Sequence, residues 1–295
     1  MSEPVIISFG EVLWDLFPDK ARFGGAPANF ACHAAVLGPS VFMVSAVGND
    51  PNGRKAIAML QSYGVDTSLI QRITSAPTGT VGVRLDTSGK PTFKIDEDSA
   101  WDRIAWSSEL EVRIAKADVV YFGTLGQRFE VSGFTIRRSL DLARKFGIHR
   151  VLDINLRAPF YDASLICESV KRCSVVKLSD DELDEVAAAC GVTAKNGLEV
   201  ILRTLLERYR LDLVVLTQGE NGALLVSPRE TIDQAGIPSK VLDTVGAGDA
   251  FTATMITGLL RGQPLSMIAR KACEAAATVC ANPGAIPELP DFKTT

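Results

Sequence analysis

The sequence has little of the material from which many enzyme sites are built. Only two histidines, His33 and His149, occur in 295 residues, and they lie in separate segments. The six cysteines contain no C-x-x-C pair. These shortages argue against a zinc centre, a redox disulfide and a catalytic histidine. A Walker-A string is missing, and no G-x-G-x-x-G follows the first expected strand, which argues against a P-loop kinase and a dinucleotide-dependent dehydrogenase.

The net charge is small, and long apolar runs are lacking. Lys and Arg total 31 against 35 Asp and Glu, a net charge of −4 with no basic block, so we expect no nucleic-acid partner. No apolar run approaches the roughly 18–20 residues of a membrane-spanning helix. The first residues, MSEPVIISFGE, lack the positive start of a secretory signal. We therefore expect a cytoplasmic globular protein with no membrane partner.

Short apolar, β-branched runs alternate with amphipathic segments of ten or more residues. This pattern is typical of a parallel sheet buried between helices, so we expect an α/β, doubly wound, mostly parallel central sheet in one domain over 1–295. Strands are expected at 5–9, 41–47, 119–122, 151–154, 175–178 and 213–217, and helices at 26–37 and 51–63.

Residues 78–96 interrupt this alternation. Two β-rich runs flank T-S-G-K-P at 87–91, which indicates a hairpin. We expect a small β lid beside the ligand cleft, with further lid strands near 11–23. The alternative is an ordinary edge hairpin on the main sheet.

Residues 240–261, KVLDTVGAGDAFTATMITGLLR, form the most informative segment. A strand-like KVLD leads into Gly246-Ala247-Gly248-Asp249, and a helical pattern follows. A glycine turn that opens a helix presents backbone N–H groups to an anion at the positive end of the helix dipole. Asp249 would repel that anion, so its expected role is the general base that takes the proton from an attacking alcohol. The alternative role is a stabilising acid at a helix N-terminus.

The string D-T-V-G-A-G-D at 243–249 resembles the signature of the ribokinase family of sugar kinases, also called the phosphofructokinase-B type. G-G-A-P-A-N at 24–29 resembles that family's first signature. Together with FGEVLWDLFP at 9–18, these strings are most similar to the bacterial fructokinase branch. The resemblance implies ATP-dependent phosphorylation of a primary sugar hydroxyl, with fructose as the expected acceptor. It implies a catalytic group of Asp249, Gly246, Ala247 and Gly248.

The resemblance also assigns the sugar and nucleotide contacts. Burying a polyol requires several convergent hydrogen-bonding groups. By resemblance, the sugar-binding group is Asp15, Gly24, Gly25 and Asn29. The D-x-N-x-R string at 153–157 ends an expected strand, and the ATP-binding group is Asn155, Arg157, Thr217, Gly219, Gly222 and Asn282.

Magnesium is expected because triphosphate chemistry needs a cation that bridges phosphate oxygens. The resemblance gives Glu182 to the magnesium and its waters. The family has Asn-x-x-Glu here, whereas this chain has Ser179, and Ser-x-x-Glu is also a complete capping box. A monovalent cation, K⁺, is implied beside Asp243, Val245 and the 279–286 stretch.

Other functions fit the same residues. The acceptor could be 2-keto-3-deoxygluconate, for which Arg84 and Lys94 are candidate cations, or ribose or a nucleoside. A non-catalytic sugar or nucleotide sensor is the third hypothesis, and the presence of Asp249 argues against it. Relatives of this type often pair through their lids, so a homodimer is expected.

Overall fold

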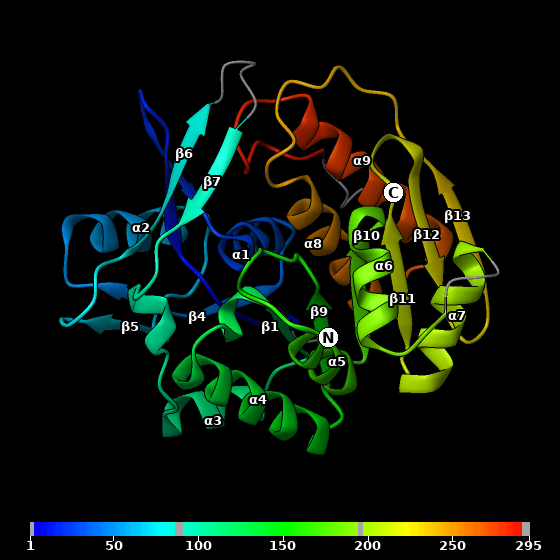
Figure 1. Ribbon diagram of the computed structural model, residues 1–295, viewed down its shortest axis with the longest axis horizontal. Helices are drawn as coiled ribbons and strands as arrows, with labels where there is room; N and C mark the ends of the chain where they lie inside the picture. Colours follow the sequence, from blue (N-terminus) through cyan, green and yellow to red (C-terminus); the bar gives the residue numbers. More distant parts are fainter. Residues whose placement is uncertain (1–2, 86–90, 194–196, 291–295) are drawn as a thin grey trace.

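The computed structural model describes residues 3–85, 91–193 and 197–290. Its main sheet contains β1 Val5–Phe9, β4 Ser40–Gly48, β5 Ile70–Ile73, β8 Val119–Gly123, β9 His149–Asp153, β10 Val175–Ser179, β11 Leu213–Thr217, β12 Gly222–Val226 and β13 Thr231–Ala235. The strand order is β13-β12-β11-β10-β9-β8-β1-β4-β5 (Figure 1). The pairs β11–β12 and β12–β13 are antiparallel and the six other pairs among the described strands of this sheet are parallel, so the expected mostly parallel, doubly wound sheet is confirmed.

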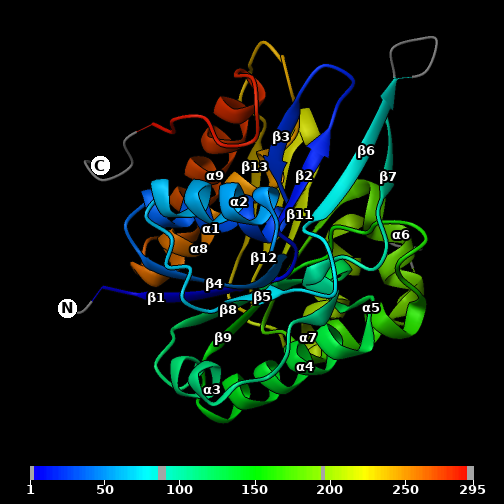
Figure 2. The ribbon, with the colours of Figure 1, turned by 90° about the vertical axis from the view of Figure 1, so that its left-hand side faces the viewer.

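Helices cover both faces of this sheet (Figure 2). One layer contains α1 Ala26–Val36, α2 Pro51–Ser62, α8 Ala247–Leu260 and α9 Leu265–Cys280. The other contains α3 Ser108–Ile114, α4 Glu130–Lys145, α5 Ala163–Arg172, α6 Asp180–Ala189 and α7 Leu198–Tyr209. Each layer shares a separate apolar cluster with the sheet. In the described part of the chain, no helix combines the length and apolar character needed to cross a membrane.

Helix α8 is unusual because ten consecutive residues, 249–258, are all buried. Small and apolar side chains surround it, and it packs on both α1 and α9. A helix that is apolar on every side belongs in the interior rather than at the surface. The first turn of α8, which carries Asp249, is therefore held inside the protein.

A second, four-stranded sheet has the order β3-β2-β6-β7, with β3 Ala21–Gly24, β2 Leu13–Leu16, β6 Gly79–Leu85 and β7 Pro91–Ile95. It rises beside the main sheet in Figure 2. Strands β6 and β7 pair antiparallel as the hairpin pattern predicts, while residues 86–90 of the expected turn lie outside the described residues. The alternative of an edge hairpin on the main sheet is wrong.

The expected strand at 240–243 is also wrong. This segment is irregular, and the N–H groups of Leu242 and Asp243 donate to the carbonyl of Cys280 at the end of α9, at 2.7 and 3.3 Å. Val241 and Leu242 are each 61% exposed. The β-branched, apolar pattern favours a strand locally, but the backbone N–H groups of this segment pair with the end of α9 instead of with a strand.

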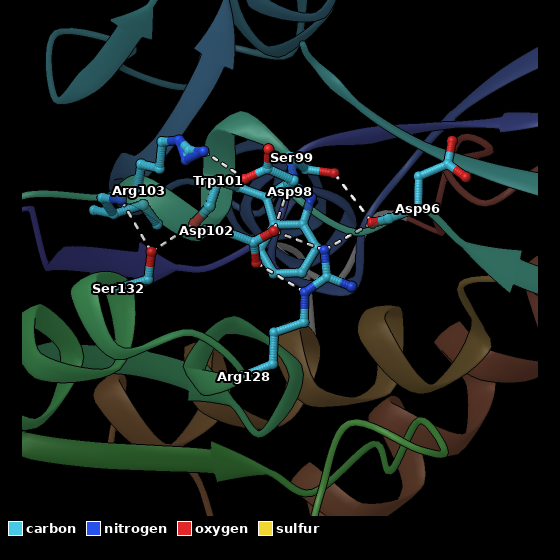
Figure 3. A network of polar contacts seen from close by, with 9 residues as sticks. Asp96, Asp98, Ser99, Trp101, Asp102, Arg103, Arg128 and Ser132 are labelled. Carbon is cyan, nitrogen blue, oxygen red and sulfur yellow. Dashed lines mark hydrogen bonds and ion pairs between the residues drawn. The ribbon is translucent and has the colours of Figure 1, made fainter. Parts of the chain in front are cut away.

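A buried ion pair joins the end of β7 to the main body (Figure 3). The strand leads into the short helix η1 Ala100–Arg103, which carries Asp102. Arg128 donates from Nε and Nη2 to both oxygens of Asp102, at 2.8 and 2.7 Å, and from Nη2 to the carbonyl of Asp96 at 2.7 Å. Its guanidinium lies 4.0 Å from the ring centroid of Trp101. Both charged side chains are 1% exposed.

We expect Arg128→Met to lower the free energy of unfolding by about 3 kcal/mol, because the charge of Asp102 then stays buried without compensation. Urea unfolding measures this loss. The matched control is Arg103→Met, which breaks the more exposed pair with Asp98 and should cost less than about 1 kcal/mol. Equal losses in the two variants would contradict the prediction.

Candidate active site

The glycine turn stands at the start of α8. Gly246 is the N-cap residue with φ +85°, a conformation that favours glycine. A Cβ on Gly246 would lie 2.4 Å from the carbonyl oxygen of Ala285, so the turn has no room for a side chain. The N–H groups of the first helical turn have no acceptor within the helix. Ala247 and Gly248 are the first two residues of α8, directly before Asp249.

The two sequence signatures meet at Asp249. Asn29 of α1 donates from Nδ2 to Oδ2 of Asp249 at 2.9 Å, across 220 residues of sequence. Burial raises the pKa of Asp249 to about 7, and the negative charge of Asp153 adds to this effect. The hydrogen bond from Asn29 and the charges of Lys177 and Arg157 act in the opposite direction. The carboxyl group therefore titrates near neutrality, as suits a general base.

Asp153 and Lys177 form a buried pair that sequence reasoning missed. Lys177 Nζ donates to Asp153 Oδ1 at 3.1 Å, and Thr252 of α8 donates to the other oxygen at 3.2 Å. The ammonium lies 3.0 Å from the position that a Cβ on Gly248 would take. Burial lowers the pKa of Lys177, but the nearby Asp153 and Glu182 raise it more, so the side chain stays protonated. The available signal was a charged residue inside each of two buried strands.

Glu11 is a second overlooked acid. It follows β1 and is 4% exposed. Burial raises its pKa to about 7, opposed by backbone N–H groups and by the charge of Arg157, while the charge of Asp249 raises it further. Glu11 lines a small cavity with Tyr121 and Asp153 at the carboxyl ends of β1, β8 and β9. This is the edge where open α/β sheets bind ligands.

Asp15 and the Gly24-Gly25 loop lie together. Asp15 on β2 stands opposite Arg22 on β3, and its Oδ2 is 2.6 Å from the position of a Cβ on Gly24. Gly25 is the N-cap residue of α1 with φ +105°, and a Cβ there would lie 2.4 Å from the carbonyl of Glu11. Burial raises the pKa of Asp15 to about 6 against the charges of nearby arginines. Three of the predicted sugar-binding residues, Asp15, Gly24 and Gly25, thus lie beside one another.

Arg157, assigned to ATP from the sequence, also influences Asp15, one of the predicted sugar-binding residues. Its charge lowers the pKa values of Asp15, Glu11 and Asp249. The side chain is exposed, and its Nη1 donates to the carbonyl of Leu156 at 2.9 Å. A role towards ATP stays a prediction.

Glu182 forms the capping box at the start of α6, as its sequence pattern allows. Its Oε2 accepts from the N–H of Ser179 at 2.8 Å. Its Oε1 accepts from the N–H of Leu156 at 2.7 Å, a contact not foreseen from the sequence. The preceding Asn155 has φ +43°, an uncommon conformation for a residue with a side chain. Glu182 therefore fixes the 155–157 loop as well as capping α6, and its metal role stays a prediction.

The remaining nucleotide candidates lie on two other loops. Thr217 ends β11, Gly219 begins the short helix η3 Gly219–Asn221, and Gly222 begins β12. Asn282 follows α9 and donates from Nδ2 to the carbonyl of Thr278 at 2.8 Å. Among the described residues, the hydrogen bonds of Asp249 do not include these candidates, and their nucleotide role stays a prediction.

Asp243, expected at a monovalent-cation site, accepts three N–H donors. Arg22 Nη1 donates to Oδ2 at 2.7 Å, Gly284 N to Oδ2 at 3.4 Å, and Val245 N to Oδ1 at 3.1 Å. N–H donors therefore contact both carboxylate oxygens, and the monovalent-cation role of Asp243 and Val245 stays a prediction.

Magnesium fits this site as a hydrated ion that is bound together with the nucleotide. Among the described residues, no group of three or more His, Cys, Asp and Glu side chains is arranged to hold a metal ion. Mg²⁺ that accompanies a nucleotide commonly keeps its waters and takes most other ligands from phosphates. The surplus of acidic groups around Lys177, which include Glu182 and Asp153, provides the negative surroundings that such a hydrated ion favours.

Comparisons with known proteins agree with this geometry. The "ATP-dependent 6-phosphofructokinase" of Thermoanaerobacterium thermosaccharolyticum is 26% identical over 98% of this chain and 92% of the relative. The "Fructokinase" of Salmonella typhimurium is 30% identical over 92% of this chain and 90% of the relative. The crystal structure of fructokinase from Vibrio cholerae O395 with fructose, ADP and calcium bound superposes with a TM-score of 0.82, at 25% identity, covering 97% of this chain and 96% of that one.

The family assignment rests on a match over nearly the whole chain. The profile of the pfkB family carbohydrate kinases matches residues 10–291, which include both signatures, the four-stranded sheet and α8. The resemblance stated from the sequence is thereby confirmed, and so is the expectation of a carbohydrate kinase with a ribokinase-like fold. The chain belongs to the pfkB family of carbohydrate kinases.

Proposed function

We propose that this protein transfers the γ-phosphoryl group of ATP to a primary hydroxyl of fructose. The observation that carries the proposal is the hydrogen bond from Asn29 to Asp249, which brings a carboxyl group of raised pKa to the meeting point of the two signatures. The named relatives include fructokinases and an ATP-dependent 6-phosphofructokinase, which supports a fructose-type acceptor.

The proposed reaction uses Asp249 as general base. Asn29 holds Oδ2, which leaves Oδ1 to accept the proton from the sugar hydroxyl. The hydroxyl oxygen attacks the γ-phosphorus. The bond between the γ-phosphorus and the oxygen that bridges it to the β-phosphorus breaks, and ADP leaves. The N–H groups from Gly246 to Asp249 face the charge that develops on the transferred group. Magnesium, when bound with ATP, supplies neutralisation of the phosphate oxygens.

Other side chains hold the reactants in this scheme. Asn29 Oδ1 is buried without a partner in the described part of the chain, which leaves it free to accept a sugar hydroxyl. Asp15 supplies carboxylate oxygens to further hydroxyls. The protonated Lys177 keeps a positive charge beside Gly248, where the γ-phosphate would lie. Closure of the four-stranded sheet over the sugar would exclude water, the competing acceptor.

A second acceptor is favoured by one observation. The exposed Arg157 places a positive charge near Asp15, which suits a sugar acid such as 2-keto-3-deoxygluconate. Of the lid cations named from the sequence, Lys94 is exposed at the β6–β7 pair, and the side chain of Arg84 lies outside the described residues. We also propose that two chains associate through the four-stranded sheet, whose edge strands are β3 and β7.

A coupled ADP-release assay with ATP and Mg²⁺ tests the proposal across fructose, fructose 6-phosphate, 2-keto-3-deoxygluconate, ribose and a nucleoside. We expect the highest kcat/KM with fructose. Asp249→Asn should lower kcat by about 10³-fold, because a general base commonly contributes 10²–10⁴. The matched control is Asp181→Asn on the exposed start of α6, which should keep full activity. Full turnover by Asp249→Asn would contradict the proposed base, and sugar binding without ADP release would favour a sensor.

The pH dependence follows from the raised pKa of Asp249. The base must be ionised, so kcat/KM should fall about tenfold per pH unit below pH 7 and level off above it. Glu11 titrates in the same range, so the control is Glu11→Gln, which should keep this acid limb. A profile flat from pH 5 to 8 would contradict the assignment.

The same shift has a consequence for stability. Between pH 4 and 7 the folded state binds more protons at Asp249 than the unfolded state does, so this group's contribution to folding free energy weakens as pH rises. Asp249→Asn should lose that decline and unfold at higher urea than the parent at pH 8. A variant that is less stable than the parent at both pH 6 and pH 8 would contradict this.

Substitution of Glu182 separates its two roles. Glu182→Ala removes acceptors from the N–H groups of Ser179 and Leu156, so we expect a loss of about 1–2 kcal/mol in unfolding free energy. If Glu182 also holds the hydrated magnesium, the apparent affinity for Mg²⁺ should weaken in the turnover assay. The control is Ser179→Ala, which removes the other half of the capping box and should leave the Mg²⁺ dependence unchanged. An unchanged Mg²⁺ dependence in Glu182→Ala would leave capping and loop positioning as its functions.

A further inference from the structure

Arg22 makes a contact that the sequence patterns do not anticipate. It lies on β3, the edge strand of the four-stranded sheet, and its Nη1 donates to Asp243 Oδ2 at 2.7 Å, 221 residues away. Arg22 is 31% exposed and Asp243 is 17% exposed, so solvent only partly screens the pair. The guanidinium also lies 4.8 Å from the ring centroid of Phe17, which restricts where it can move.

Asp243 connects this sheet to the glycine turn. Its Oδ1 accepts from Val245 N, directly before Gly246, and its Oδ2 accepts from Gly284 N in the loop after α9. The carbonyl oxygen of the neighbouring Ala285 lies 2.4 Å from the position that a Cβ on Gly246 would take. One carboxylate therefore fixes both segments that shape the turn at the start of α8, and Arg22 neutralises it.

The residues at Asp243 do not fit an added monovalent cation. Such an ion needs several oxygen ligands, whereas three of the roughly four acceptor positions of this carboxylate already take N–H groups. One of these donors is itself a full positive charge that is always ionised. A second cation beside Asp243 would be repelled by the guanidinium at close range.

We propose that Arg22 is a positioning residue and the resident cation of this site. It takes the place expected for K⁺, so phosphoryl transfer proceeds without an added monovalent cation. The same side chain stands opposite Asp15 on β2 and lowers its pKa. Binding of a sugar at Asp15 is therefore coupled, through Arg22 and Asp243, to the conformation of the glycine turn at the start of α8.

The inference rests on the proposed roles of Asp249 and the glycine turn, but not on fructose. The test uses whichever sugar the acceptor panel finds, with chloride salts of K⁺, Na⁺ and tetramethylammonium at one ionic strength. The parent should turn over at rates within about twofold in all three salts, since only screening is shared among them. A saturable activation of the parent by K⁺ of about tenfold or more would overturn the proposal.

Variants of Arg22 sharpen the test. Arg22→Gln should lose roughly tenfold or more in kcat in tetramethylammonium, because a displaced turn no longer meets the phosphate, and K⁺ should restore part of it. Arg22→Lys should keep more activity than Arg22→Gln. The matched control is Lys20→Gln, which removes a charge from the turn between β2 and β3, at an exposed pair with Asp19, and should behave as the parent. Parent-like kinetics of Arg22→Gln in every salt would overturn the proposal.

Thermal unfolding gives a readout that does not need turnover. K⁺ should shift the melting temperature of the parent no more than Na⁺ does, whereas Arg22→Gln should gain a K⁺-specific rise. A K⁺-specific rise in the parent would overturn the proposal even if Arg22→Gln fails to fold. Loss of the proposed function would be seen separately, as full activity of Asp249→Asn with an unchanged salt response.

Discussion

The hydrogen bond between Asn29 and Asp249 is the contact on which the site depends. It joins α1, which begins after the Gly24-Gly25 loop proposed to bind the sugar, to α8, which begins at the glycine turn proposed to bind the phosphate. The bond requires α1 and α8 to pack closely, and both helices carry buried alanines, including Ala28 and Ala250, that permit a short distance between backbones. Small residues on these helices therefore help to set the geometry of the Asn29–Asp249 contact.

The interior of the site holds more negative than positive charge. Glu11 follows β1, Asp153 ends β9 and Asp249 lies in the first turn of α8, and all three are buried. Lys177 forms an ion pair with Asp153. Burial of unpaired carboxylates is costly, and the raised pKa values of Glu11 and Asp249 are its direct expression. A site arranged to bind a cation-carrying triphosphate is thus destabilised when empty, a common exchange of stability for function.

The sequence predicted the parallel sheet, the helix starts and the hairpin, because each depends on a local period of apolar residues or on turn chemistry. It failed at 240–243, where an apolar doublet has a strand's composition but no strand beside it. It also missed Lys177 and Arg22, because the partner of each lies on a distant segment and no spacing rule marks such pairs. The dual role of Glu182 was visible as a pattern, whereas its bond to Leu156 was not.

The packing of the protein itself requires glycine at two positions of the signatures. A side chain at Gly25 would strike the carbonyl of Glu11, and one at Gly246 would strike that of Ala285, and both residues have positive φ. The two loops are therefore held by their own packing in the conformation that exposes backbone N–H groups. Donors fixed in advance stabilise developing charge without the cost of reorganisation during the reaction. In the proposed mechanism, the same packing explains why few polar side chains suffice: the backbone would supply the anion site, and the carboxylate of Asp249 beside it would supply the base.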